Sequence, residues 1–581
     1  YATYGVSEAS SNELFRSIFR LNPLTDVYNE DGTLRLFPDE TTTNIVNPLL
    51  EVQNQRILNK SLHVFGNLYL EYKPFSWLKF TTTFTPDITY GNQGEYRGKD
   101  TKSSKGNQNA TRAVYDTSQG VKYTWDNIIY AEKKFGAHNG NITLGSTWYY
   151  NAWENSHMRA DAFSTDHYEW YNMGAGTMKE MSSGYGQEQL MSYFARFNYD
   201  FKGKYFLTFT GRYDGSSKLA DGHRWAFFPS AALGWRISDE SFLKDIESIS
   251  NLKLRLSYGV SGSDRAVSPY QSTQNIANGK YVFGGVGVNS VYFSGFENKT
   301  LSWEKTKEVN IGLDYAFFNG RINGTIDWYN RRTVDIIMNR RLPNTSGYSA
   351  LRDNVGEVLN RGIEIGLNTV NIRTKDFTWT TNINFTKNHN EILALSDGSD
   401  RDEGNKWFVG ESIGSVWTYT VLGIWQEDEK EEAAKYGQAP GNLKLLDKDN
   451  NYTFTNADKE IQGSVFPKWT AGMTNTFKYK NIDLAIFMYT RQGQYSYSQF
   501  HRQHSMNDNK TFNVIRLDYW TPENTTGTWP RPGLTLQDAE KDALYYQKTS
   551  FVKVGYINLG YTLPEIWSKH CLLYTSDAAD E

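Results

Sequence analysis

The chain has 581 residues and a formal net charge of −4, so no strong electrostatic field favours nucleic acid or anionic lipid as a partner. Hydrophobic residues make up 39% of the chain, and no stretch approaches the roughly 18 apolar residues that a membrane-spanning helix needs. The single cysteine, Cys571, excludes a disulfide framework and a thiolate metal site, while 15% aromatic residues with only 14 prolines favour β-strands.

Alternating apolar and polar residues predict long strands, the first of which begins near Ser61. In the segment NLKLRLSYGV, Leu254 and Leu256 share one face of a strand, whereas Lys253 and Arg255 share the other. The same alternation recurs in MSYFARFNYD, DFTWTTNINFT and KWTAGMTNTFKY. Each of these strands therefore has one apolar and one polar face.

The dipeptide Asn319-Gly320 is the strongest short hairpin signal in the chain. With these two residues as the loop, Phe317 faces Ile322, and the apolar faces of the two strands match. A two-residue loop at 480–481 aligns the apolar faces of its strands in the same way. The turn sequences thus support the strand predictions on both sides of them.

The turn in NYDFKGKYFLTF needs a different loop length, because a two-residue loop would misalign the apolar faces. A three-residue loop at 201–203 aligns Phe197 with Leu207. It also places Gly203 where the backbone takes a positive φ, which glycine adopts without steric cost.

Short turns and long polar connections alternate along the chain, which predicts roughly fifteen strands and two further short ones within 413–425. A sheet of that many amphipathic strands, with short turns at one end and long loops at the other, is typical of an outer-membrane barrel. The alternative is a soluble all-β protein such as a propeller or stacked sandwiches. No repeat of about 40–50 residues supports a propeller, and strands of soluble proteins are typically shorter.

Six ordered stretches of the chain resemble SusC-type TonB-dependent transporters, the large glycan and peptide importers of Bacteroidetes outer membranes. They include TFTGRYDGSSKLADGHRWAFFPSAALGWRISDESFLKD, LSWEKTKEVNIGLDYAFFNGRI and DNVGEVLNRGIEIGL. The stretches span residues 208–245, 252–264, 301–322, 353–367, 440–473 and 550–564. They are spaced through most of the chain and are specific as a set.

The resemblance implies an all-β fold, namely an antiparallel transmembrane β-barrel located in the cell outer membrane. Residues 61–570 would be an incomplete part of a 22-stranded TonB-dependent transporter barrel. Residues 1–60 would be an extracellular loop or a partial upstream barrel segment. The family's signal peptide, TonB-contacting segment and plug domain would precede Tyr1, because this chain contains none of them, and closing strands would follow His570.

The resemblance also implies a function, the import of oligosaccharides or peptides, and not an enzymatic activity. The implied partners are a SusD-like surface lipoprotein, outer-membrane lipid and the TonB–ExbB–ExbD complex, which would act through the missing N-terminal region. No cofactor is required. No nucleophile elbow, zinc-protease motif or phosphate-binding loop is present in the sequence, which gives an enzyme no positive support.

Four aromatic residues of the long connection after residue 394 are candidates for stacking on a sugar substrate. They are Trp407, Trp417, Tyr419 and Trp425. The competing interpretation is that most aromatic residues of such a chain form the two interfacial girdles of a barrel. For these loop positions, both interpretations stay open.

The segment DKDNNYTFTNAD follows the spacing of a calcium-binding loop, in which oxygen ligands alternate along the chain. The candidate ligands are Asp447, Asp449, Asn451, Thr453 and Asp458, at positions 1, 3, 5, 7 and 12. Tyr452 stands where the sharp turn favours glycine, and Asp458 replaces the usual bidentate glutamate. An acidic turn without metal is therefore the alternative to a structural Ca²⁺ site.

Two other functional classes remain alternatives to an importer. One is a structural or adhesive outer-membrane barrel with surface-exposed loops. The other is a secreted β-rich protein that binds or acts on glycans. A plug domain and a SusD-like neighbour in the full gene would favour import over both.

The tail CLLYTSDAADE, residues 571–581, interrupts the alternation where closing strands are expected. It resembles a translated sequencing adapter. We therefore expect the natural protein to continue beyond His570 and Cys571 to have no function.

Overall fold

The structure is a computed structural model that describes residues 1–581 except 10–11, 40–42, 349, 397, 506–512 and 564–581. The expected adapter segment with Cys571 lies outside the described residues. In the described part of the chain, no helix is both long enough and apolar enough to cross a bilayer.

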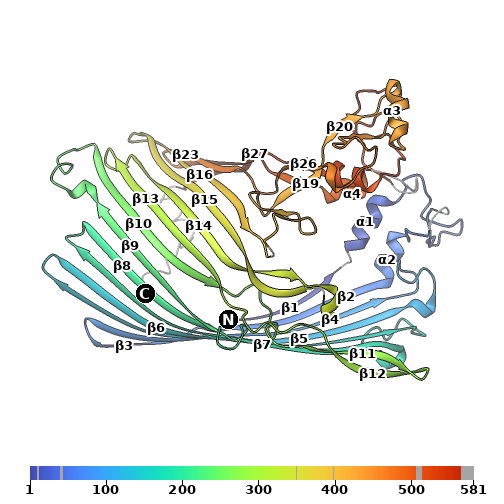
Figure 1. The fold of residues 1–581 in the computed structure, drawn as a ribbon, viewed down its shortest axis with the longest axis horizontal. Helices are drawn as coiled ribbons and strands as arrows, with labels where there is room; N and C mark the ends of the chain where they lie inside the picture. Colours follow the sequence, from blue (N-terminus) through green and yellow to red (C-terminus); the bar gives the residue numbers. More distant parts are fainter. Residues whose placement is uncertain (10–11, 40–42, 349, 397, 506–512, 564–581) are drawn as a thin grey trace.

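One antiparallel sheet of seventeen strands dominates the described residues and curves into a trough (Figure 1). From β4 onward, each of these strands pairs with the next strand of the sheet along the chain, and long loops or short hairpins connect them. The strands are β1 (Ala2–Ala9), β2 (Gln55–Phe65), β3 (Leu68–Phe75), β4 (Leu78–Arg97), β5 (Arg112–Phe135), β6 (His138–Asp161), β7 (Thr177–Phe201), β8 (Tyr205–Ser216), β9 (Trp225–Arg236), β10 (Ile249–Ser263), β13 (Glu304–Phe317), β14 (Ile322–Arg341), β15 (Ala350–Arg373), β16 (Phe377–Ala394), β23 (Trp469–Tyr479), β24 (Ile482–Gln492) and β27 (Phe551–Tyr561).

The strand count confirms the prediction. β2 and β3 pair with the two halves of β4 and act as one interrupted wall strand. Without β1, and with β2 and β3 taken together, the seventeen strands of the described sheet reduce to the fifteen that were expected. β1 pairs with β2, and residues 1–60 also contain the helices α1 (Asn12–Arg20) and α2 (Pro48–Asn54).

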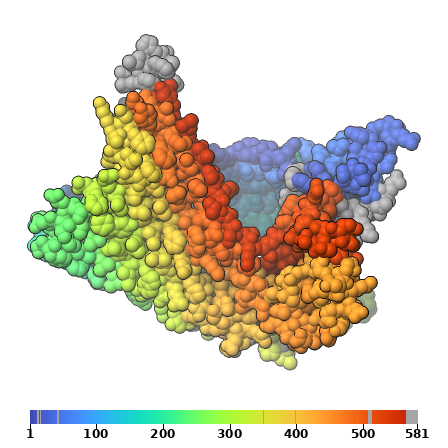
Figure 2. All heavy atoms as spheres, turned by 90° about the horizontal axis from the view of Figure 1, so that it is seen from above, coloured from blue at the N-terminus to red at the C-terminus, as the bar shows by residue number. Residues whose placement is uncertain are grey.

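The wall is apolar outside and polar inside, the reverse of a soluble protein. On β10, Leu254 and Leu256 are 38% and 45% exposed on the outer face. Arg255, between them, points to the other face and forms ion pairs with Asp314 and Asp327. Exposed leucines suit the hydrocarbon of a bilayer, whereas paired charges suit a polar lumen. The hollow side of the molecule is visible in Figure 2.

Two of the three predicted hairpin registers are confirmed. Phe317 pairs with Ile322 across the turn at 318–321. Phe477 pairs with Leu484 across the turn at 480–481. Asn319 and Gly320 both take positive φ angles, of 52° and 79°, as the hairpin signal requires.

The third predicted register is wrong, because the loop begins one residue later than the predicted 201–203. Phe201 pairs with Tyr205, so the loop is 202–204 and Phe197 faces Phe209. The Asp200 carboxylate accepts a hydrogen bond from the Gly203 N–H at 2.6 Å, which stabilises the later turn. Gly203 still has a positive φ of 66°, and the pairing shifts by two residues, so the apolar faces still match.

Compact hydrophobic clusters lie at the long-loop end of the sheet. One cluster joins the 214–224 loop to the start of β13 and contains Leu219, Phe228, Leu301 and Trp303. The hairpin of β11 (Ile276–Phe283) and β12 (Val286–Phe293) projects from the same end (Figure 1). The long connections are therefore folded units.

Candidate functional site

All nine candidate site residues lie in one folded unit built from the described residues of two long connections, 395–468 and 493–550. We call it the loop unit; Figure 1 shows it at one end of the sheet, beside α1 and α2. Its small strands pair as β17 (Arg401–Asp402) with β18 (Trp407–Phe408), β19 (Ser415–Tyr419) with β22 (Lys459–Ser464), β20 (Val421–Ile424) with β21 (Leu443–Leu445), and β25 (Tyr495–Tyr497) with β26 (Tyr546–Lys548). Its helices are α3 (Lys430–Lys435), α4 (Gln499–His504) and α5 (Asp538–Leu544).

The two connections share a core, which fixes them relative to each other. Tyr419, Leu443 and Leu445 of the first connection pack with Ala543 of α5. The carboxylate of Glu540 on α5 accepts hydrogen bonds from the Leu443 N–H, at 3.3 Å, and from the Gln537 N–H, at 2.7 Å. Burial raises the pKa of Glu540 although these two donors oppose the shift.

Three of the four candidate aromatic rings are buried in the loop unit. Trp417 and Tyr419 are 6% and 7% exposed, and the Lys459 Nζ lies 5.0 Å from the centre of each ring. Trp425 is 3% exposed and donates a hydrogen bond from its indole N–H to the Gln438 Oε1 at 2.6 Å. In this conformation their faces contact protein, so the rings stabilise the unit.

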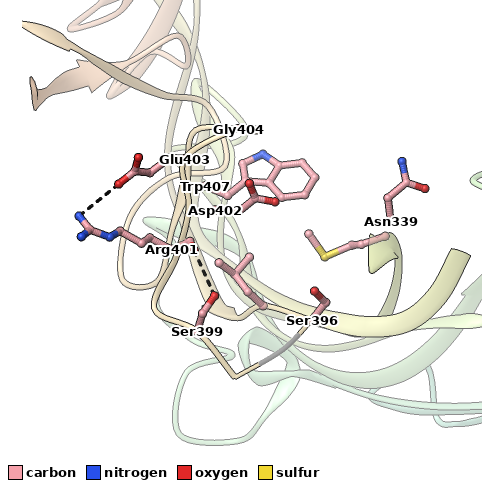
Figure 3. Close-up of a pocket in the computed structure, with 10 residues that line it drawn as sticks. Asn339, Ser396, Ser399, Arg401, Asp402, Glu403, Gly404 and Trp407 are labelled. Atoms are coloured by element: carbon pink, nitrogen blue, oxygen red, sulfur yellow. Dashed lines mark hydrogen bonds and ion pairs between the residues drawn. The ribbon is translucent and has the colours of Figure 1, made fainter. Parts of the chain in front are cut away.

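Trp407 is the candidate that borders a cavity (Figure 3). The cavity has a volume of about 330 Å³ and lies between the end of β14 and the connection after β16. Met338, Leu395 and the Trp407 ring give it an apolar side, and serine, carboxylate and guanidinium groups give it a polar side. That combination, in a small concave site, is what binds part of a polar ligand.

The charged residues of this cavity were not predicted from the sequence. They are Arg401, Asp402 and Glu403, of which Arg401 lies 3.6 Å from the Glu403 carboxylate. Glu403 also accepts a hydrogen bond from the Asn456 side chain at 2.9 Å. The segment SDRDEGNKW carries opposite charges beside Trp407, and this clustering was the signal available in the sequence.

The calcium-like loop folds so that three of its carboxylates converge. One oxygen each of Asp447, Asp449 and Asp458 lie within 4.8 Å of one another. Tyr452, at the position that favours glycine, takes a positive φ of 61°, so the sharp turn forms without glycine. Asp458 is fully buried, and its two oxygens accept backbone N–H bonds from Lys448 and Thr455, at 2.9 and 2.8 Å.

Hydrogen bonds within the loop stabilise its ionised carboxylates, as a bound cation also would. Burial opposes ionisation of Asp447, but N–H donors from Tyr452 and Asn450 hold the pKa of Asp447 below its usual value. Asn451 bonds to Asp449 and to Thr453. The carboxylates keep further lone pairs, so the donor set fits a hard cation.

Inside the trough, asparagine side chains form a neutral ladder across β14, β15 and β16. Asn368 donates to Asn323 at 3.2 Å, Asn382 donates to Asn368, and Asn384 donates to Asn382 at 3.0 Å. Nearer the loop unit, Asn360 accepts bonds from two further asparagines of β16, Asn388 and Asn390. We call these residues the amide ladder.

Comparison with known proteins agrees with this architecture. The family model described as TonB dependent receptor-like, beta-barrel matches residues 8–540. A TonB-dependent receptor of Formosa agariphila is 32% identical over 572 residues, covering 95% of this chain and 56% of that protein. The TonB-dependent receptor SusC of Bacteroides thetaiotaomicron is 30% identical over 563 residues, covering 90% of this chain and 52% of SusC.

A solved structure shares the fold. The RagAB peptide importer in its closed-closed state superposes with a TM-score of 0.79 at 19% identity, covering 98% of this chain and 64% of that chain. The chain spans about half the length of the curated relatives it matches.

Proposed function

Because the chain belongs to the TonB-dependent receptor-like β-barrel family of the outer membrane, we propose that its parent protein imports a polar nutrient. The barrel wall described above would enclose the route, and the loop unit would form part of the surface that meets the substrate. The observation that carries this proposal is the inside-out wall, with exposed leucines on one face and paired charges and amides on the other.

An oligosaccharide is the first substrate class that we propose. The amide ladder offers neutral donors and acceptors along the inner wall, which suit the hydroxyl groups of a sugar chain. Trp407 offers an aromatic ring beside polar groups, as a sugar subsite would. Sugar stacking by Trp417, Tyr419 and Trp425 would require the loop unit to open, because these rings are buried.

A peptide is the second class, and a different observation favours it. Arg401, Asp402 and Glu403 line the same cavity with charges of both signs. Such charges could pair with the termini or side chains of a short peptide. The related RagAB structure is that of a peptide importer, which concerns that protein alone.

The proposed partners follow from the family. A SusD-like surface lipoprotein would contact the loop end of the barrel, and TonB with ExbB and ExbD would act through the N-terminal region of the full-length protein. We also propose that Asp447, Asp449, Asn451, Thr453 and Asp458 hold a structural Ca²⁺, since three of the carboxylates already converge. The ion would join the two ends of the 447–458 loop.

The test is uptake by cells that carry or lack the full-length gene. Cells would receive fluorescently labelled oligosaccharides or a labelled peptide mixture, with and without a protonophore. We expect one substrate class to enter only when the gene is present, and a protonophore to abolish its entry. Gene-independent uptake, or gene-dependent uptake that persists with the protonophore, would contradict energised import and favour a structural or adhesive barrel.

A further inference from the structure

An apolar groove crosses the outer wall of the barrel near the short-turn end. Its volume is about 600 Å³, and its floor includes Leu207, Leu233, Leu254 and Leu256 from three neighbouring strands, β8, β9 and β10. Leu207 pairs with Leu233, which sits opposite Leu256, so the leucines form a continuous row. This face carries the exposed leucines that contact the bilayer.

Two aromatic rings close the groove at the end that faces the turns. Tyr205 and Trp235 are paired residues of β8 and β9, and both line the groove. The Tyr205 hydroxyl and the Trp235 indole N–H both donate to Glu240 Oε1, at 2.5 and 3.1 Å. One carboxylate therefore holds both rings in place.

This arrangement differs from an ordinary interfacial aromatic girdle in two respects. The rings are fixed by a shared acceptor, so they cannot rotate freely to cover the neighbouring leucines. The same carboxylate lies 3.5 Å from the Lys204 Nζ through its other oxygen, which places both signs of charge at the rim. The groove thus has an apolar floor and a zwitterionic end.

Apolar contact alone would not select an occupant here, since lipid tails are as apolar as leucine and any acyl chain could fill the groove. Selectivity must come from the polar rim. An ammonium group can pair with Glu240, and a phosphate oxygen can accept hydrogen bonds from Lys204. A headgroup that carries both charges matches both residues.

We propose that this groove is a binding site for one zwitterionic phospholipid of the periplasmic leaflet, with an acyl chain on the leucine floor and a phosphoethanolamine headgroup at Lys204 and Glu240. The short turns of such barrels face the periplasm, which puts the rim at the headgroup level of that leaflet. The site is independent of the proposed import, because it lies on the outer wall and binding needs no transport.

The test is native mass spectrometry of the full-length protein released from detergent micelles. Dioleoyl-phosphatidylethanolamine and dioleoyl-phosphatidylglycerol are added separately at equal concentrations. We expect one phosphatidylethanolamine adduct to survive activation that removes the other lipids. Leu233→Trp, which fills the groove, should lower its occupancy by about tenfold or more, the loss expected when a contact worth about 1.4 kcal/mol is removed.

Two further variants separate this site from general lipid coating. Ile311→Trp is the control, because Ile311 pairs with Leu256 in the same row but lies on β13, outside the groove. It should bind like the natural protein. Glu240→Gln keeps an oxygen for the two rings but removes the negative charge, so the preference for phosphatidylethanolamine should fall roughly tenfold.

Heat-modifiable gel mobility checks that each variant is folded. If Leu233→Trp does not fold, the lipid preference of Glu240→Gln alone tests the proposed site. The proposal is overturned if phosphatidylglycerol binds as tightly as phosphatidylethanolamine to the natural protein. It is equally overturned if Glu240→Gln keeps the preference, or if folded Leu233→Trp and Ile311→Trp retain the same adduct.

Discussion

Replacing Arg255 with alanine should destabilise the barrel, because this guanidinium holds two carboxylates together on the lumen face. Its Nε donates to Asp314 at 2.9 Å, and its terminal nitrogens reach Asp327 at 3.0 Å. Gly312 makes this possible, since a Cβ there would lie 2.5 Å from the Arg255 Cζ. The backbone at Gly312 therefore leaves room for the Arg255 guanidinium between the two carboxylates.

The magnitude follows from the exposure of the three groups. Removing one partner of a fully buried ion pair costs about 3–5 kcal/mol, whereas exposed pairs contribute about 0–1 kcal/mol. The side chains of Arg255, Asp314 and Asp327 are 33%, 28% and 20% exposed. An intermediate cost of about 2–3 kcal/mol is expected, mostly because two carboxylates are left facing each other.

Urea unfolding of the full-length protein in detergent micelles, followed by tryptophan fluorescence and heat-modifiable gel mobility, measures this cost. The triple variant with Arg255→Met, Asp314→Asn and Asp327→Asn removes all three charges together. It should recover to within about 1 kcal/mol of the natural protein. The reasoning is wrong if Arg255→Ala costs under about 0.5 kcal/mol, or if the triple variant is no more stable than the single one.

Three further predictions concern the loop unit. Trp407→Ala should weaken binding of the proposed substrate by roughly three- to tenfold, measured by isothermal titration calorimetry with the full-length protein, while Phe500→Ala, at an exposed ring of the loop unit outside the cavity, serves as the control. Adding Ca²⁺ after chelation should raise the thermal midpoint of the natural protein, and Asp447→Asn should remove that rise in differential scanning fluorimetry. Because burial raises the pKa of Glu540, its contribution to stability is complete below the ordinary glutamate pKa and is lost as pH rises through the raised value. Hydrogen exchange of the Leu443 amide should therefore speed up, relative to its intrinsic rate, from acidic to neutral pH, and Glu540→Gln should flatten this change.

The barrel wall could be predicted from sequence because its information is local. Side-chain alternation assigns each residue to a face without knowledge of its partner strand. The turn at 318–321 then fixes a register, and its Asn319-Gly320 pair, which takes positive φ angles, can be recognised in the sequence. At 202–204 the choice depended on a carboxylate–amide contact between Asp200 and Gly203, which alternation does not encode. The predicted pairing of β7 with β8 was wrong by two residues, an even number, so each residue was still assigned to the correct face of the sheet.

The loop unit could not be predicted in the same way, because its contacts join residues far apart in the chain. Trp417 and Tyr419 were candidate ligand platforms, but Lys459 lies over both rings and α5 packs against Tyr419. The short helix α3 is different, since its acidic and basic residues favour a helix locally. Local rules thus succeeded inside the connection wherever no distant partner was needed.

This division between wall and loop unit bears on specificity. A substitution on the outer face of a wall strand changes one lipid-facing position. Glu540, in contrast, accepts a hydrogen bond from the amide of Leu443, which is 97 residues away in the sequence, and so couples the two connections. The cavity beside Trp407 lies where one of these connections meets β14. Residues that tune substrate choice are therefore expected to include positions such as Glu540, which set the relative placement of the connections without touching the ligand.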